Sequence, residues 1–242
     1  MPSALAQLFL PAECLLCQAV LPFARSDDLV CAVCRHRWRP VRPPWCERCG
    51  QPEPHFGPCR LCRDWPGALE RVRSGVWLDG PARRAVHALK YGGLPRIAAD
   101  LAAVMGKHLA PPDEGACLVP VPLAPRRLRR RGYNQSEALA RALGAAWRRP
   151  VRGLLARLRE TATQTTLTPA ARLANVAGAF QARNGEAGMR NAARSRRSAL
   201  VLVDDVFTTG ATIAAAARAL AQAGATRITA VTFGRAVIPD FT

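Results

Sequence analysis

Two adjacent carboxylates and a threonine-rich loop follow one another near the C-terminal end of the chain. The apolar run Ala199–Val203 leads into Asp204 and Asp205, and Thr208–Thr212 then enters an alanine-rich helical pattern. Backbone N–H groups and hydroxyls at the positive end of a helix bind phosphate. Gly210 would let the backbone approach such a ligand closely. The pattern therefore predicts a phosphate site.

The two acids beside this loop narrow the class of ligand. Carboxylates repel a bare phosphate, but they accept hydrogen bonds from sugar hydroxyls and hold hydrated Mg²⁺. A phosphorylated sugar, with its hydroxyls toward Asp204 and Asp205 and its phosphate toward the loop, satisfies both halves of the motif. The alternative is a strand end followed by an ordinary Ser/Thr turn. The length of the combined pattern favours the ligand site.

A second group of chemically active residues lies at the other end of the chain, where eight of the nine cysteines occur within the first 62 residues. They form four pairs with two-residue spacers, and two such pairs can surround one zinc ion tetrahedrally. Iron–sulfur binding or redox thiols are the weaker alternatives. The predicted zinc ligands are Cys14, Cys17, Cys31, Cys34, Cys46, Cys49, Cys59 and Cys62.

The order of the pairs suggests how they share metal. Taken sequentially, the first two pairs bind one ion and the last two bind another, although an interleaved arrangement uses the same residues. A structural zinc site contributes an apparent free energy of roughly 10–16 kcal/mol to folding at neutral pH. A proline-rich segment with little apolar periodicity needs such a contribution. The ninth cysteine, Cys117, lies in an apolar strand and is expected to be a buried small side chain.

The charge of the chain is strongly positive and unevenly distributed. Of 242 residues, 35 are basic and 17 acidic, for a net charge of +18. Residues 1–70 hold 8 arginines against 7 acids, a net +1, whereas residues 71–242 hold 27 basic against 10 acidic residues, a net +17. Such a field attracts polyanions, including nucleic acid and phosphorylated metabolites. The alternative is an arginine bias on solvated helix faces.

Composition also bounds the class of protein. Hydrophobic residues make up 49% of the chain and charged residues 21%, which indicates a globular protein. No apolar run reaches the roughly 18 residues of a transmembrane helix, so no membrane association is expected. Residues 1–11 are apolar but lack the basic stretch and the small-residue cleavage site of a signal peptide. We therefore expect a cytoplasmic protein.

The elements that must position these motifs alternate after about residue 66. Strands are predicted at Val72–Leu78, Cys117–Val121, Ala199–Val203 and Thr226–Phe233. Helices are predicted at Pro81–Tyr91, Leu94–Leu109, Asn134–Trp147, Pro169–Val176 and Ala211–Ala223, with Asn134 and Glu137 as a capping box and residues 185–197 as a loop. Alternating strands and helices predict an α/β fold with a mostly parallel sheet. The predicted domains are residues 1–66 and 67–242.

At these residues the sequence resembles the type I phosphoribosyltransferases, whose signature is an apolar strand, two acids and a TTG-type loop. Further motifs are Lys90-Tyr91-Gly92, Val119–Pro122, Arg126–Gln135, Arg159 with Gln164, and Gly178–Phe180. Together with the paired cysteines, nearly the whole chain resembles the ComF family. Members of that family join a double zinc ribbon to a phosphoribosyltransferase-like domain.

The resemblance implies that the ligand is phosphoribosyl pyrophosphate (PRPP) with Mg²⁺, and that Asp204 and Asp205 are the catalytic acids. Val121 and Pro122 in the turn, with Arg129 and Arg131, would bind pyrophosphate. Arg159 and Gln164 would belong to a closing lid, unless that stretch is an ordinary loop. The implied PRPP-binding residues are Asp204, Asp205, Val206, Phe207, Thr208, Thr209, Gly210, Ala211 and Thr212.

Two functions remain open at this point. The first is an enzyme that transfers a phosphoribosyl group, although no acceptor can be read from the sequence. The second is a protein that uses the same fold to bind single-stranded DNA, because the resemblance links the chain to natural competence and to a possible helicase partner. A purely structural zinc adaptor is a third option, which leaves the phosphate loop unexplained.

Overall fold

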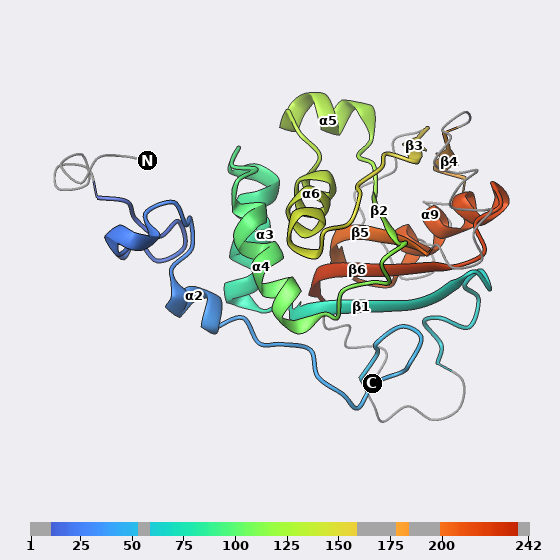
Figure 1. Ribbon diagram of the computed structural model, residues 1–242, viewed down its shortest axis with the longest axis horizontal. Helices are drawn as coiled ribbons and strands as arrows, with labels where there is room; N and C mark the ends of the chain where they lie inside the picture. Colours follow the sequence, from blue (N-terminus) through green and yellow to red (C-terminus); the bar gives the residue numbers. More distant parts are fainter. Residues whose placement is uncertain (1–10, 53–58, 159–177, 184–198, 237–242) are drawn as a thin grey trace.

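A computed structural model describes residues 11–52, 59–158, 178–183 and 199–236. Its centre is a four-stranded sheet in which every pairing is parallel, as the alternation of strands and helices predicts (Figure 1). From one edge to the other, the strands are β1 (Leu69–Trp77), β6 (Ile228–Arg235), β5 (Leu200–Phe207) and β2 (Cys117–Pro120). β5 is a central strand, so the residues at its end are surrounded by other elements.

Helices cover both faces of this sheet, because its central strands carry apolar residues on both sides. Val201 and Val203 pack with the helices α3 (Gly80–Tyr91), α4 (Ile97–His108) and α6 (Gln135–Trp147). The alternate residues Leu200 and Leu202 pack with α9 (Ala211–Gln222). This continuous apolar pattern is typical of strands buried on both faces. None of the described helices combines the length and the apolar character that crossing a bilayer requires.

Shorter elements complete the described part of the chain. α5 (Pro125–Arg131) stands above the sheet in Figure 1, and β3 (Leu155–Arg157) pairs antiparallel with β4 (Phe180–Ala182). In the cysteine-rich region there are a 3-10 helix, η1 (Phe23–Arg25), and α2 (Ala32–His36).

The structure corrects several sequence-based boundaries. The strand predicted to end at Val203 continues to Phe207, so the two acids lie within β5 and not after it. The arginine run was not predicted as a helix, yet it forms α5, which begins at Pro125 and ends at Gly132 with a left-handed φ of 80°. Neither β3 nor β4 was predicted. The helix predicted at 169–176 and the loop predicted at 185–197 lie outside the described residues.

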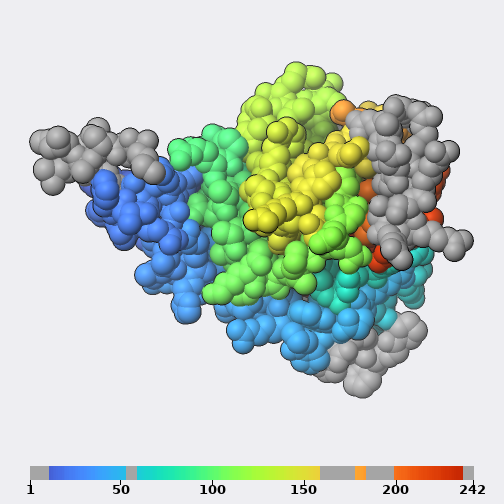
Figure 2. All heavy atoms as spheres, in the orientation of Figure 1, coloured from blue at the N-terminus to red at the C-terminus, as the bar shows by residue number. Residues whose placement is uncertain are grey.

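The cysteine-rich region packs against the sheet at two separate places. Cys14, Cys34 and Trp38 belong to the same apolar core as α3 and α4, and Trp38 meets Phe233 edge to face at 5.1 Å. The first part of the cysteine-rich region, coloured blue, lies toward one end of the molecule in Figure 2. Cys49 and Cys62 belong to the apolar core on the α9 side of the sheet, and the Val72 N–H in β1 donates to the carbonyl of Arg48 (2.8 Å). The predicted boundary at residue 66 remains a prediction.

Candidate functional site

A cavity of about 260 Å³ opens where β5 meets the loop that enters α9. This volume is slightly below that of typical small-ligand pockets, which start at roughly 300 Å³. Four cationic side chains and two carboxylates line it: Lys90, Arg127, Arg131, Arg157, Asp204 and Asp205. This excess of positive charge around a carboxylate pair suits a small anion that also carries hydroxyl groups.

Asp205 faces a lysine that comes from a distant part of the chain. Its carboxylate lies 2.5 Å from the Lys90 ammonium at the end of α3, and the Asp205 side chain is 6% exposed. Burial disfavours the charged form of Lys90, but the neighbouring carboxylates of Asp205 and Asp204 outweigh that effect and raise its pKa. The cavity therefore contains an ion pair beside the loop that enters α9.

Asp204 has a different environment. Its Oδ1 accepts hydrogen bonds from the Ser136 hydroxyl (2.7 Å), in the first turn of α6, and from the Asp205 N–H (3.0 Å). Burial, and then the nearby charge of Asp205, raise the pKa of Asp204 to about 7. Asp204 can therefore change protonation near neutral pH inside this cavity.

The loop after β5 leads into α9 through Gly210. Gly210 has a φ of +77°, in the left-handed region that favours glycine. Thr208, Gly210 and Thr212 line the cavity, whereas Thr209 does not. Thr209 is 4% exposed, and its Oγ1 has no hydrogen-bond partner among the described residues. The expected contact of the Thr209 hydroxyl with the cleft is therefore not seen.

The turn that follows β2 forms the opposite wall through Val121, Pro122 and Leu123. It offers fewer donors than the sequence suggested. The Val121 N–H donates to the carbonyl of Val203 (3.0 Å), and Pro120 and Pro122 have no N–H. Leu123 is thus the turn's candidate backbone donor. Its neighbour Val121 is held by Asn134, whose Nδ2 donates to the Val121 carbonyl (3.0 Å).

The arginine helix contributes different side chains to the cavity from those expected. Arg131 lines it as predicted, and Arg127, one helical turn earlier, lies beside it on the same face. Arg129 is exposed and is not among the lining residues. The Arg131 guanidinium lies 5.2 Å from the Tyr91 ring, which also borders the cavity.

Sequence reasoning did not assign several of the lining residues to the site, among them Lys90, Arg127, Ser136 and Arg157. Lys90 occurs in a motif that carries the family resemblance, but no local signal places it beside an acid 115 positions later in the chain. Arg157 comes from β3, which was not predicted, and its guanidinium lies 5.2 Å from the Phe180 ring. Arg159 and Gln164, the predicted lid residues, lie outside the described residues.

The eight paired cysteines gather into two groups of four, in sequential order: Cys14, Cys17, Cys31 and Cys34, and then Cys46, Cys49, Cys59 and Cys62. Within each group all sulfur atoms lie within 4.8 Å of one another. Three of the sulfur pairs are separated by 3.7, 3.8 and 3.5 Å. A zinc tetrahedron with bonds of about 2.3 Å has edges of about 3.8 Å, so both groups fit this metal.

The four sulfur atoms of each group lie close enough to share one cation. Without a metal, burial and the charges of Cys59 and Cys46 raise the pKa of Cys62 to about 12, and burial likewise raises the pKa of Cys34 and Cys49, whereas backbone hydrogen bonds outweigh burial and lower the pKa of Cys14 and Cys46. Four thiolates this close together repel one another unless a cation lies between them. The two groups are therefore four-cysteine zinc-binding sites, with one ion expected in each.

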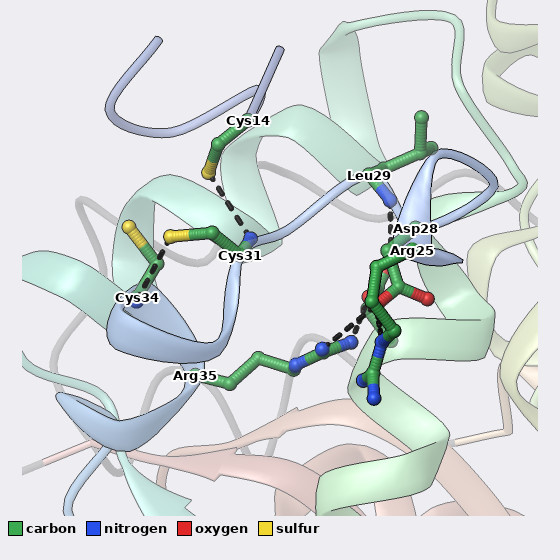
Figure 3. Close-up of polar contacts among 8 residues, drawn as sticks. Cys14, Arg25, Asp28, Leu29, Cys31, Cys34 and Arg35 are labelled. Atoms are coloured by element: carbon green, nitrogen blue, oxygen red, sulfur yellow. Dashed lines mark hydrogen bonds and ion pairs between the residues drawn. The ribbon is translucent and has the colours of Figure 1, made fainter. Parts of the chain in front are cut away.

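The first cysteine group is fastened to α4 through the Arg35 side chain and the Leu29 N–H, both labelled in Figure 3, which contact one buried carboxylate. Asp100 accepts from the Arg35 guanidinium (2.7 Å) and from the Leu29 N–H (3.2 Å). Asp28 accepts from the same guanidinium at 2.8 Å. Burial raises the pKa of Asp100 despite these contacts. This group therefore lies beside α4, whereas the cavity is formed by other elements.

Comparisons with known proteins agree with this architecture. The family model described as "Double zinc ribbon domain" matches residues 5–63. The DNA utilization protein YhgH of Salmonella typhimurium is 34% identical over 235 residues, which cover 91% of this chain and 96% of that protein. Competence protein ComFC of Bacillus subtilis is 29% identical, covering 87% and 89%.

A third relative, Competence protein F of Haemophilus influenzae, is 28% identical and covers 91% of this chain and 95% of its own. These similarities extend across the cysteine groups, the sheet and the cavity. The chain therefore belongs to the ComF family, which includes proteins named for competence and for DNA utilization.

Proposed function

We propose that the cavity binds the 5-phosphoribosyl group of PRPP together with Mg²⁺, and that this binding serves the handling of incoming DNA. One observation carries the proposal: Asp204, Asp205, Thr208 and Gly210–Thr212 border a single small cavity with excess positive charge. Two relatives are named competence proteins, which supports the link to DNA uptake. We also propose that the bound phosphoribosyl group is then transferred, with pyrophosphate as the leaving group.

Each wall of the cavity would act on a different part of the ligand. The loop backbone, with Thr208 and Thr212, would hold the 5-phosphate at the start of α9. Asp204 and Asp205 would accept from the ribose hydroxyls or from water on Mg²⁺. Arg127 and Arg131 would neutralise the charge that develops on pyrophosphate as its bond to the sugar weakens. Water would have to be excluded for transfer rather than hydrolysis.

Titration calorimetry with PRPP and Mg²⁺ tests the site. Asp205→Asn removes a charged acceptor, and hydrogen bonds to charged groups contribute roughly 1.5–3 kcal/mol. We expect this variant to bind at least about tenfold more weakly than the wild type. Asp27→Asn, an exposed position near the first cysteine group, is the matched control and should bind normally. Equal affinities of the wild type and Asp205→Asn would contradict the assignment.

A second candidate function is binding of single-stranded DNA, and α5 is the observation that favours it. Five of its seven residues are arginine, and Arg126, Arg129 and Arg130 are exposed. Tyr91, 61% exposed beside this helix, offers an aromatic face of the kind on which bases stack. Trp38 and Trp65, in contrast, are buried in the apolar cores. A helicase partner remains a prediction from the family resemblance.

Fluorescence anisotropy with a labelled oligothymidine, measured over a range of salt concentrations, tests this surface. Arg129→Gln with Arg130→Gln should weaken binding and flatten the salt dependence, by a slope of about 0.7 for each lost phosphate contact. The control, Arg63→Gln with Arg218→Gln, removes the same charge from the α9 side. If both double variants weaken binding equally, α5 is not the DNA-binding surface.

A further inference from the structure

The proposed phosphate loop, Thr208–Thr212, packs directly against Trp65, which follows the second cysteine group (Cys46, Cys49, Cys59 and Cys62) in the sequence. A Cβ atom added at Gly210 would lie 2.6 Å from the Trp65 ring and 2.9 Å from the Phe207 ring. The two rings meet nearly edge to face, with centroids 6.1 Å apart. Trp65 follows Cys62 by three residues, and the backbone N–H of Trp65 donates to the Cys62 carbonyl (3.2 Å). The second cysteine group and the loop are thus separated by a single layer of side chains.

A buried arginine makes a second connection between the same two parts. Arg235, at the end of β6, is 2% exposed. Its guanidinium donates to the carbonyl of Cys49 (2.8 Å) and to the Gln51 side chain (2.8 Å), and it lies 4.5 Å from the Phe207 ring. A charge is stable in the interior only when its partners stay in place. Arg235 therefore ties the position of Phe207 to the conformation of the Cys49 turn.

Arg48 makes a third connection, between the second cysteine group and the backbone around Trp65. Its guanidinium donates to the carbonyls of Cys62 (2.9 Å), Trp65 (3.2 Å) and Pro66 (3.0 Å). The carbon at the centre of that guanidinium lies 5.9 Å from the Trp65 ring. Because Arg48 stands between Cys46 and Cys49 in the sequence, the same metal-binding turn fixes the backbone on which Trp65 is mounted.

The first cysteine group has different neighbours. It contacts α4 through Asp100, Arg35 and Leu29, and it shares the apolar core on the α3 and α4 side of the sheet. Cys49, Cys62, Trp65 and Phe207 belong to the core on the α9 side. The two metal sites of one chain therefore support different faces of the sheet.

We propose that the second cysteine group positions the phosphate loop, with Trp65 and Arg235 as the positioning residues that connect it to Phe207 and Gly210. Metal at this group and phosphate in the loop then stabilise each other, whereas metal at the first group has no such effect. The half of this proposal that concerns the ligand rests on the proposed function. The half that concerns the order of the loop does not, because it depends only on contacts within the chain.

The experiment compares full-length Cys59→Ser with Cys17→Ser, a matched loss of one ligand at each site. Zinc content is counted, and amide hydrogen exchange is followed by mass spectrometry. We expect peptides spanning 206–214 to exchange at least about tenfold faster in Cys59→Ser and at the wild-type rate in Cys17→Ser. Peptides spanning 97–108 should show the reverse. Equal loop protection in both variants, or loosening in Cys17→Ser alone, would overturn the proposal.

A second pair of variants keeps the metal in place, in case Cys59→Ser does not fold. Trp65→Ala should retain both zinc ions yet show faster exchange in the loop, and Trp65→Phe should restore protection because it keeps a ring against Gly210. PRPP affinity should fall in parallel in Trp65→Ala, within the 5- to 150-fold range typical of coupled sites. Wild-type exchange in Trp65→Ala would overturn the positioning role.

Reciprocity supplies a readout in the wild-type protein. If the loop and the second metal stabilise each other, PRPP must slow the release of one of the two zinc ions to a chelator and leave the other unchanged. Unchanged release of both ions, with PRPP bound, would refute the coupling. If the wild type fails to bind PRPP while the loop still loosens in Cys59→Ser, the proposed function fails and the positioning role stands.

Discussion

At the scale of single residues, the acids of the candidate site differ because their partners differ. Asp205 faces the Lys90 ammonium, whereas Asp204 accepts from a hydroxyl and an amide in a buried position. Two adjacent residues of one strand thus provide a paired carboxylate and one whose pKa is about 7. A divalent cation would favour the ionised form of Asp204, so cation-dependent binding of a ligand should strengthen as pH rises through neutrality.

The same residue predicts a pH dependence of stability. The ordinary pKa of an aspartate is about 3.9. Because the folded state keeps the proton on Asp204 up to about pH 7, the free energy of unfolding should fall as pH rises from about 4 to about 7, and then level off. Urea unfolding of the wild type and Asp204→Asn across this window measures the effect. The difference in stability between the two should change with pH, and a constant difference would refute the prediction.

Local signals predict a ligand class at these residues, which stays a prediction, but they did not indicate the partners that surround the two acids. The string from Asp204 to Thr212 is contiguous, so its chemistry can be read directly from the sequence. Lys90 and Ser136 reach the acids only through the fold, from α3 and α6. The sequence also placed the acids after the strand, because exposed strand ends are where charged residues usually occur. Their partners allow them to lie inside it.

At the scale of elements, the short connection from β2 through α5 to α6 shapes one side of the cavity. Asn134 begins α6 by accepting from the Ser136 N–H (3.1 Å), as predicted, while also donating to the Val121 carbonyl. Glu137 pairs with Arg141 (2.7 Å) instead of closing a capping box. One side chain therefore fixes both the helix that carries Ser136 and the turn that lines the cavity.

Asn134→Ala should consequently affect both stability and binding. Loss of a helix cap costs about 1 kcal/mol, which lowers Tm by roughly 2–4 °C in a chain of this size. Asn134→Ser, which can cap but cannot reach Val121, separates the two effects. We expect thermal unfolding to show a lower Tm for Asn134→Ala and recovery for Asn134→Ser, with PRPP affinity reduced in both. A Tm of Asn134→Ala equal to that of the wild type would contradict the capping role.

Periodicity predicted the long helices and the parallel sheet, because their apolar residues recur at regular spacing in the sequence. It failed for α5, whose five arginines show no apolar stripe. That helix is defined by its ends, Pro125 and Gly132, and by Arg127 and Arg131 facing the cavity. β3 and β4 are three residues each, too short for a pattern to emerge.

At the scale of the whole molecule, the cysteine-rich region is built into the cores on both faces of the sheet. Cys14 and Cys34 belong to one core, and Cys49 and Cys62 to the other. The spacing of the cysteines predicted the metal but left a sequential and an interleaved arrangement open, and the structure groups the cysteines in sequential order. No sequence pattern indicates that the two groups pack on different faces. The whole chain carries a net charge of +18, which favours polyanionic partners.

Metal removal should therefore destabilise the entire fold. Domains are stable by only about 5–15 kcal/mol, comparable to the apparent contribution of one structural zinc. A loss of even about 5 kcal/mol would lower Tm by roughly 10–20 °C. Calorimetry of the protein before and after chelation of both ions should show a drop of that size. An unchanged Tm after metal removal would show that the metal sites do not stabilise the fold.

The account depends most on what occupies the cavity beside β5. A crystal structure of the full-length protein soaked with PRPP and Mg²⁺ measures this directly. We predict density for the 5-phosphate against the backbone of Thr208–Thr212, with the ribose hydroxyls or the cation at Asp204 and Asp205. PRPP bound elsewhere, or a cavity that stays free of ligand at saturating concentration, would contradict the assignment of this site.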